Sequence, residues 1–179
     1  RRRVLRRVMR QAAAVALGSL ADVRISGREN LPEGGPLLVA ANHFSYIDPV
    51  AMVRLAPWPI EFVGGFNMPN APGWTRLIPK LWGFYPVYRG TASRDALRAA
   101  EVVLNQGGVL GIAPGGGSWA PVWRPPRPGP AFLADRTGAR ILPIGIDGAP
   151  DVFPSIRRGK RARFTIRIGK PFGPLCAPG

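Results

Sequence analysis

The sequence has little of several residue types, and each shortage excludes a class of protein. One of its 179 residues is cysteine, Cys176, so no disulfide can form within the chain and a disulfide-stapled secreted module is excluded. Histidine also occurs once, as His43, and without a cysteine cluster it leaves no convincing set of metal ligands. No apolar run approaches the roughly 18 residues that a membrane-spanning helix requires, since the best stretch, 12–17, is far too short.

Acidic side chains are also few. The chain has 25 Lys and Arg against 10 Asp and Glu, a formal net charge of +15. This surplus favours an anionic partner: nucleic acid, an anionic membrane surface, or a phosphorylated or acidic substrate. Nucleic acid is disfavoured because the arginines are spread over the whole chain and none of the usual nucleic-acid-binding motifs is present. A dinucleotide site is disfavoured too, because no G-x-G-x-x-G follows the first predicted strand.

The remaining composition is that of one folded domain, with 46% apolar and 20% charged residues. Short apolar runs, typical of strands buried on both faces, alternate with segments of helical periodicity. Strands are predicted at 37–41, 60–63, 109–113 and 141–146, and helices at 93–105, at 130–137 and from Asp48-Pro49 onward, where Asp48 is the expected cap. Residues 161–168 alternate apolar and basic side chains, as a half-exposed strand does. The order predicts a single α/β domain with a mixed, largely parallel sheet flanked by helices.

Residues 1–22 are predicted to be a basic amphipathic helix that precedes a domain spanning 23–179. An apolar stripe recurs at three- and four-residue spacing, with Arg3, Arg6, Arg7 and Arg10 elsewhere around the helix; the stripe consists of Val4, Leu5, Val8, Ala12, Val15 and Ala16. One interpretation places the stripe in a membrane interface with the arginines on phosphate headgroups. The other is a helix that packs on the domain and leaves a solvated face.

The start of the chain also has the layout of a signal peptide, a basic start and then a short apolar run. Its richness in arginine and the structured sequence after it disfavour a cleaved signal. Because the sequence begins at Arg1 rather than at a methionine, the possibility of an upstream segment that holds an anchor stays open.

The single histidine directly follows the predicted strand 37–41, and strand ends are where α/β domains present reactive groups. His43 and Asp48 are five residues apart, so they would face apart on a regular helix or strand and can meet only across a turn. A histidine oriented by a carboxylate can take a proton from a hydroxyl, because the acid holds the tautomer and stabilises the imidazolium that forms. The structural alternative makes His43 a hydrogen-bonding residue at a strand end and Asp48 only a helix cap.

The string Asn42-His43-x4-Asp48 resembles the N-H-x4-D block of the glycerolipid (lysophospholipid) acyltransferase superfamily, which includes the 1-acylglycerol-3-phosphate acyltransferases. Three further blocks follow in the family's order, so the resemblance extends from about residue 23 to residue 171. Residues 83–89 resemble a block with a glycine and, six residues later, an arginine. Residues 113–118 resemble a block that is usually Phe-Pro-Glu-Gly followed by small or basic residues and Ser, and residues 141–144 resemble an apolar strand that carries a proline.

The resemblance implies an O-acyltransferase of phospholipid biosynthesis. Such an enzyme moves a fatty acyl chain from an acyl thioester, on coenzyme A or an acyl carrier protein, to the hydroxyl of a lysophospholipid such as 1-acylglycerol 3-phosphate. It implies no cofactor besides this donor, no metal and no covalent acyl-enzyme. The implied partners are the donor, the lysophospholipid and an anionic membrane surface, and the implied location is peripheral, on the cytoplasmic face of the cell membrane.

The resemblance also implies a role for individual residues. His43 is the expected general base and Asp48 its orienting partner. Asn42 is expected to help set the loop, and Arg89 to bind the acceptor phosphate. The remaining substrate-binding residues form a turn whose backbone N–H groups suit an anion or a tetrahedral oxyanion, and they are Gly115, Gly116, Gly117 and Ser118.

The third block departs from the family pattern, because Gly115 stands where the family carries Glu and Ala113 where it carries an aromatic residue. No acidic residue lies between Glu101 and Asp135 to replace that carboxylate. The loss leaves acceptor identity open and keeps an alternative, a catalytically weak or silent membrane-surface domain of the same fold. A basic set that could contact headgroups or an acidic carrier protein consists of Arg124, Arg127, Arg157, Arg158, Lys160, Arg161 and Arg163.

Overall fold

The computed structural model describes residues 2–45, 47–64, 82, 84–86, 94–115 and 125–173. Within them, seven strands form one sheet in the order β1-β7-β6-β2-β5-β3-β4. All neighbouring strands are parallel except β6 and β7, which confirms the predicted α/β domain with a mixed, largely parallel sheet. The strands are β1 (Ala21–Ser26), β2 (Leu37–Ala41), β3 (Ile60–Gly64), β4 (Phe84–Pro86), β5 (Val109–Ile112), β6 (Arg140–Asp147) and β7 (Ala162–Ile168).

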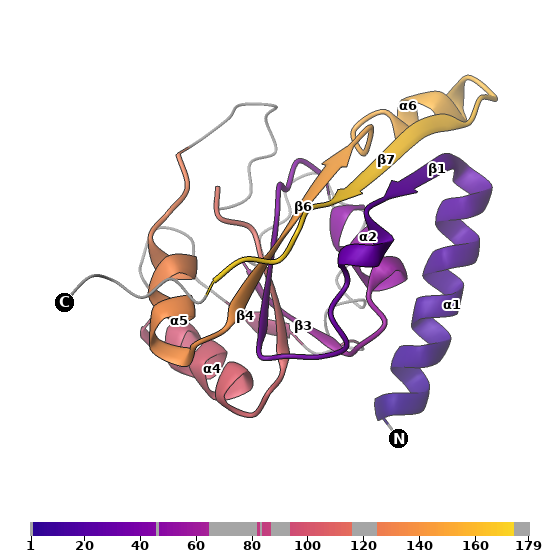
Figure 1. Cartoon of the computed structure of the whole chain (residues 1–179). Helices are drawn as coiled ribbons and strands as arrows, with labels where there is room; N and C mark the ends of the chain where they lie inside the picture. Colours follow the sequence, from indigo (N-terminus) through magenta and orange to yellow (C-terminus); the bar gives the residue numbers. More distant parts are fainter. Residues whose placement is uncertain are drawn as a thin grey trace.

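Helices cover both faces of the sheet, with α1 and α2 on one side and α4 and α5 on the other (Figure 1). Successive side chains of β2 alternate between the two apolar cores, because neighbouring residues of a strand point to opposite faces. Leu37 and Val39 lie in the core beneath α1 and α2, whereas Leu38 lies in the core beneath α4 and α5. The helices are α1 (Arg2–Leu20), α2 (Asp48–Leu55), α4 (Arg94–Asn105), α5 (Gly129–Thr137) and α6 (Val152–Arg157), and a 3-10 turn spans Arg28–Asn30.

Most predicted elements appear within one or two residues of their expected bounds. The helices α4 and α5 are followed by Gly107 and Gly138, which adopt φ angles of 72° and 65° that favour glycine. In β7 the predicted alternation is confirmed, because Phe164 and Ile166 are buried while Arg163 is exposed. Two strands and one helix were not predicted: β1, β4 and α6. β1 follows α1 without a breaking residue between them, β4 is only three residues long, and α6 is only six residues long.

The N-terminal helix packs on the domain with the face opposite to its predicted apolar stripe. Val4, Val8 and Val15 of the stripe are 69%, 59% and 68% exposed. The inward face carries Leu17, which is buried, and two partly buried residues that pack on the core, Met9 and Ala13.

Two arginines of α1 also point toward the domain. Arg6 donates from Nε to the carbonyl of Trp82 at 2.9 Å, pairs with Glu61 at 2.6 Å and lies over the Trp82 ring. Arg10 donates to the carbonyl of Ala56 at 3.0 Å. The interpretation that puts these two arginines on membrane headgroups is therefore wrong, because the protein itself binds them. In the part of the chain that the structure describes, no helix is both long and apolar enough to cross a bilayer.

Candidate active site

The residues with catalytic potential lie in the loop that leaves the centre of the sheet. β2 has β5 on one side and β6 on the other, and all three run parallel, so their carboxyl ends meet at one edge. Residues 42–47 connect that end of β2 to the start of α2. The loop thus holds its side chains at the switch between neighbouring strands, the position where open α/β sheets bind ligands.

His43 and Asp48 meet across this turn, as their spacing predicts. The Nδ1 atom of His43 lies 3.1 Å from Oδ2 of Asp48. The Asp48 side chain is 2% exposed, whereas that of His43 is 23% exposed and can be reached from outside. The pair therefore combines a buried carboxylate with an accessible imidazole, the arrangement that a proton-accepting histidine requires.

The carboxylate of Asp48 is held by the loop that precedes it. Oδ2 accepts hydrogen bonds from the backbone N–H groups of Phe44 at 2.7 Å and Ser45 at 2.8 Å. The prediction that Asp48 caps α2 is wrong: the capping position is Ile47, no side chain caps the helix, and Asp48 is its first residue. The carboxylate points back to the preceding loop rather than to the N–H groups of the helix, because the loop amides and the imidazole hydrogen-bond to it. These contacts satisfy a charge that would be costly to bury alone.

Asn42 ties the loop to strand β6. Its Nδ2 atom donates to the carbonyl of Ile146 at 2.6 Å, and its Oδ1 atom accepts from the N–H of Ile146 at 2.7 Å. Both ends of the amide are engaged by backbone, so these contacts set the position of the loop, as expected for Asn42, rather than present the amide to a substrate. Ile146 is 104 residues away along the chain, and no local pattern in the sequence pointed to it.

The third sequence block begins at the same edge. Pro114 and Gly115 form a turn just after β5, and Ala40 of β2 is in register with Ile112 of β5. The carbonyl of Pro114 accepts a hydrogen bond from the N–H of Arg127 at 2.9 Å, which ties the turn to the segment before α5. The other predicted substrate-binding residues, Arg89, Gly116, Gly117 and Ser118, lie outside the described residues, and their roles stay predictions. Among the described residues, no group of His, Cys, Asp and Glu could hold a metal ion.

Comparison with known proteins points to one family. A protein-family model described as Acyltransferase matches residues 22–147. The 1-acyl-sn-glycerol-3-phosphate acyltransferase of Bacillus subtilis (strain 168) is 22% identical over 161 residues, which are 89% of this chain and 78% of that protein. The crystal structure of the 1-acyl-sn-glycerophosphate (LPA) acyltransferase, PlsC, from Thermotoga maritima matches with a TM-score of 0.71 at 22% identity, covering 99% of this chain and 73% of that one. The structural match shows that the two chains share a fold.

Proposed function

Because the chain belongs to the acyltransferase family, we propose that it moves a fatty acyl chain from a thioester to the hydroxyl of a lysophospholipid, with 1-acylglycerol 3-phosphate as the acceptor. The observation that carries the proposal is the hydrogen-bonded pair of His43 and Asp48 at the carboxyl edge of the sheet. The names of the Bacillus subtilis and Thermotoga maritima relatives support this acceptor.

In the proposed reaction His43 acts as the general base. Asp48 engages Nδ1, so Nε2 is the ring nitrogen that takes the proton from the acceptor hydroxyl. The hydroxyl oxygen attacks the thioester carbonyl carbon and forms a tetrahedral oxyanion. The carbon–sulfur bond then breaks, the thiolate leaves and takes the proton from the imidazolium, and the ester and a free thiol remain. The alcohol and the thioester together supply every atom of the ester and the free thiol, so the reaction needs no other reactant.

Asp48 contributes charge and position in this scheme. Its carboxylate stabilises the imidazolium that forms when Nε2 accepts the proton, and it holds the tautomer in which Nδ1 carries hydrogen. The amides of Phe44 and Ser45 keep the carboxylate in place, so little reorganisation is needed during the reaction. Asn42 holds the start of the same loop against β6.

The parts of the proposal that concern the acceptor and the donor rest on roles predicted from the sequence. Arg89 is proposed to bind the acceptor phosphate, and the turn of Gly115, Gly116, Gly117 and Ser118 is proposed to donate N–H groups to the oxyanion or phosphate. The donor is an acyl chain on coenzyme A or an acyl carrier protein. The product is a diacylated phospholipid precursor, and we place the reaction in phospholipid biosynthesis on the cytoplasmic face of the cell membrane.

The test is acyl transfer by the purified chain in detergent micelles. Oleoyl-coenzyme A is supplied with lysophosphatidate, and the released thiol and the new phospholipid are both quantified. The proposal predicts the two products in equal amounts, with little thiol released when the acceptor is omitted. The reaction is repeated with an oleoyl acyl carrier protein to identify the donor. No ester product with lysophosphatidate, glycerol 3-phosphate or other lysolipids would instead support the silent domain that the replacement of Glu by Gly115 leaves open.

A further inference from the structure

Arg6 joins α1 to the start of the last two strands of the sheet. Its Nε atom donates to the carbonyl of Trp82 at 2.9 Å, and its guanidinium lies 5.5 Å from the centre of the Trp82 ring. The same guanidinium pairs with Glu61 on β3 at 2.6 Å. The Arg6 and Glu61 side chains are only 15% and 21% exposed, so salt screens this pair less than a fully exposed one. One arginine therefore fixes α1 both to β3 and to the residue that precedes β4 by two positions.

Trp82 is held on two sides. Its indole Nε1 atom donates at 2.7 Å to the carbonyl of Ile60, at the start of β3, while its own carbonyl accepts the bond from Arg6. The Trp82 side chain is 6% exposed and belongs to the apolar core beneath α1 and α2. Because Trp82 comes directly before the block at 83–89, these contacts set the point from which that block begins.

The strand that follows Trp82 has little else to hold it in place. β4 is three residues long and lies at the end of the sheet, where, among the described residues, it pairs with β3 alone. A three-residue pairing supplies few hydrogen bonds between strands, so the position of β4 depends on contacts outside the pairing. The contacts of Trp82 with Ile60 and Arg6 are of this kind.

β4 leads to the same edge of the sheet as the loop that carries His43. β2, β5, β3 and β4 all run parallel, and their registers place Pro86, the last residue of β4, in the same row as Ala41, the last residue of β2. His43 follows Ala41 by two residues, and Arg89 follows Pro86 by three. The two strands are three strand spacings apart, about 14 Å, a distance that an arginine side chain and a glycerol phosphate can span together. The position of β4 therefore matters for an acceptor that Arg89 and His43 are proposed to share.

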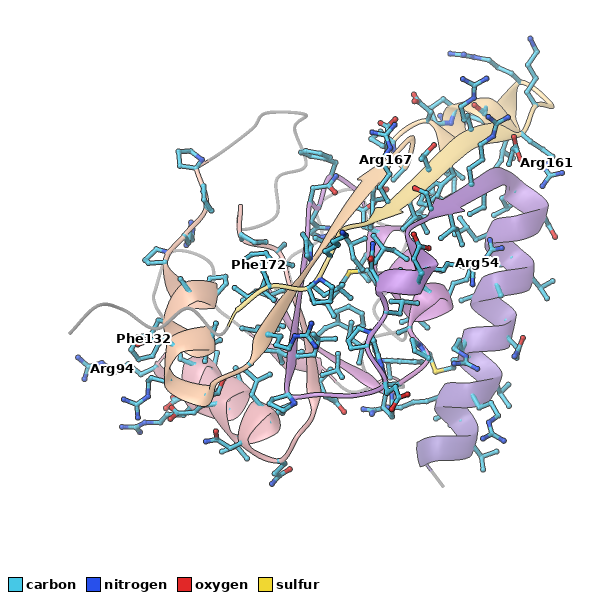
Figure 2. All side chains as sticks on the ribbon, viewed as in Figure 1. Arg54, Arg94, Phe132, Arg161, Arg167 and Phe172 are labelled. Carbon is cyan, nitrogen blue, oxygen red and sulfur yellow. The ribbon has the colours of Figure 1, made fainter. Side chains whose placement is uncertain are left out.

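The rest of α1 has its own contacts with the domain. At the end of the helix that leads into β1, the guanidinium of Arg161 donates to the carbonyl of Ala21 at 2.7 Å. Figure 2 shows Arg161 beside this end of α1. Leu17 is buried in the core there, and Arg10, one turn after Arg6, donates to the backbone at the end of α2. Loss of the Arg6 contacts is therefore expected to leave α1 on the domain and to release mainly the start of β4.

We propose that Arg6 is a positioning residue for the acceptor site. Through Trp82 it sets the start of β4, and with it the block at 83–89 whose Arg89 is proposed to bind the acceptor phosphate. Glu61 holds the guanidinium of Arg6 in the orientation that makes this contact. Arg6 itself does not touch the substrate. The inference rests on the proposed function, which assigns the acceptor phosphate to Arg89.

The first test separates the KM for the acceptor from kcat. Arg6→Gln is assayed in detergent micelles with oleoyl-coenzyme A and lysophosphatidate, at a temperature where urea unfolding shows every variant to be folded. The KM for lysophosphatidate is expected to rise by about 3- to 10-fold, because Arg89 is displaced rather than removed and only part of a charge-assisted hydrogen bond is lost. The kcat and the KM for the donor are expected to stay close to native, because the loop 42–47 is anchored to β6 rather than to β4.

The matched control is Arg10→Gln. Arg10 lies on the same helix and also donates to a backbone carbonyl of the domain, that of Ala56 at 3.0 Å, but it does not contact Trp82. This variant is expected to keep the native KM for lysophosphatidate. An equal rise in that KM for both variants would mean that only the docking of α1 matters, which overturns the proposal. Trp82→Phe is a second variant: it removes the bond to Ile60, keeps the carbonyl that Arg6 binds, and is expected to raise the same KM.

A double-mutant cycle tests whether Arg6 acts through Arg89. Arg89→Gln alone is expected to raise the KM for lysophosphatidate by about 10- to 100-fold, the worth of a hydrogen bond to a charged group. Adding Arg6→Gln to it should raise that KM little further, because the residue that Arg6 positions is already gone. Fully additive effects would overturn the inference. A native KM for Arg89→Gln would contradict the proposed function, whereas a raised KM for Arg89→Gln with a native KM for Arg6→Gln would overturn this inference alone.

Discussion

Replacing Asn42 by Asp tests how the loop 42–47, which carries the proposed general base, is held. The substitution exchanges one NH2 group for an oxygen and leaves the shape of the side chain nearly unchanged. In the native chain Nδ2 donates to the carbonyl of Ile146 at 2.6 Å. A carboxylate at that position brings a negatively charged oxygen against a carbonyl oxygen, so the loop must move away from β6. His43 is the next residue in the chain and moves with it.

The expected magnitude follows from these contacts. Losing one hydrogen bond of net worth about 0.5–1.5 kcal/mol and adding an oxygen–oxygen repulsion lowers the free energy of unfolding by about 2–3 kcal/mol. A displacement of about 1 Å at a reacting group can cost roughly a hundredfold in rate. We therefore expect kcat per folded molecule to fall by about 10- to 100-fold, with a smaller change in the KM for the acceptor, because the substitution moves the proposed base rather than the acceptor site.

The chain supplies a matched control for the stability effect. Asn30 donates from Nδ2 to the carbonyl of Ile168 at 2.9 Å, so Asn30→Asp makes the same chemical change at a residue of the 3-10 turn Arg28–Asn30, which lies outside the loop 42–47. Both variants are unfolded in urea and assayed for acyl transfer at a temperature where each is folded. Asn30→Asp is expected to lose stability and keep its kcat. The reasoning is refuted if Asn42→Asp also keeps its kcat, or if both variants lose it equally.

Three further substitutions test the site and its support. Asp48→Asn keeps the size of the side chain and removes its charge, so kcat should fall by about 10²–10⁴-fold; a native rate in the transfer assay would show that the carboxylate is not used. Gly115→Glu restores the carboxylate of the family pattern and should raise turnover with a phosphorylated acceptor; unchanged or lower turnover counts against this account of the acceptor site. Gly111→Ala places a Cβ 2.8 Å from the ring of Phe62, so urea unfolding should show a loss of about 1–3 kcal/mol; native stability would mean that the ring moves freely aside.

Most of the strands and the contact between His43 and Asp48 could be predicted because their patterns are local. Apolar runs such as 37–41 are typical of strands buried on both faces, and β2 has the predicted bounds. The spacing of His43 and Asp48 required a turn, and the structure has one. The anchoring of Asn42 by Ile146 could not be predicted, because it depends on two strands that are distant in sequence lying side by side.

The sequence left two interpretations of α1 open, and in the structure the apolar stripe faces away from the core. The stripe that contains Val8 is the more apolar side of the helix, and an apolar side normally faces the core. Here the core side includes arginines, because the guanidinium of Arg6 reaches both Glu61 and the ring of Trp82 and its side chain is only 15% exposed. Periodicity alone does not distinguish an apolar helix face that packs on the domain from an apolar helix face that is exposed.

The central claim is that His43 takes the proton from the acceptor hydroxyl. The most direct test compares the initial rate of acyl transfer from oleoyl-coenzyme A to lysophosphatidate for the native chain and for His43→Ala, with urea unfolding to establish that both are folded. The account predicts that the rate falls by about 10²–10⁴-fold in the variant while the KM for the donor changes little. A variant that keeps more than about a tenth of the native rate, well short of that loss, would contradict the claim.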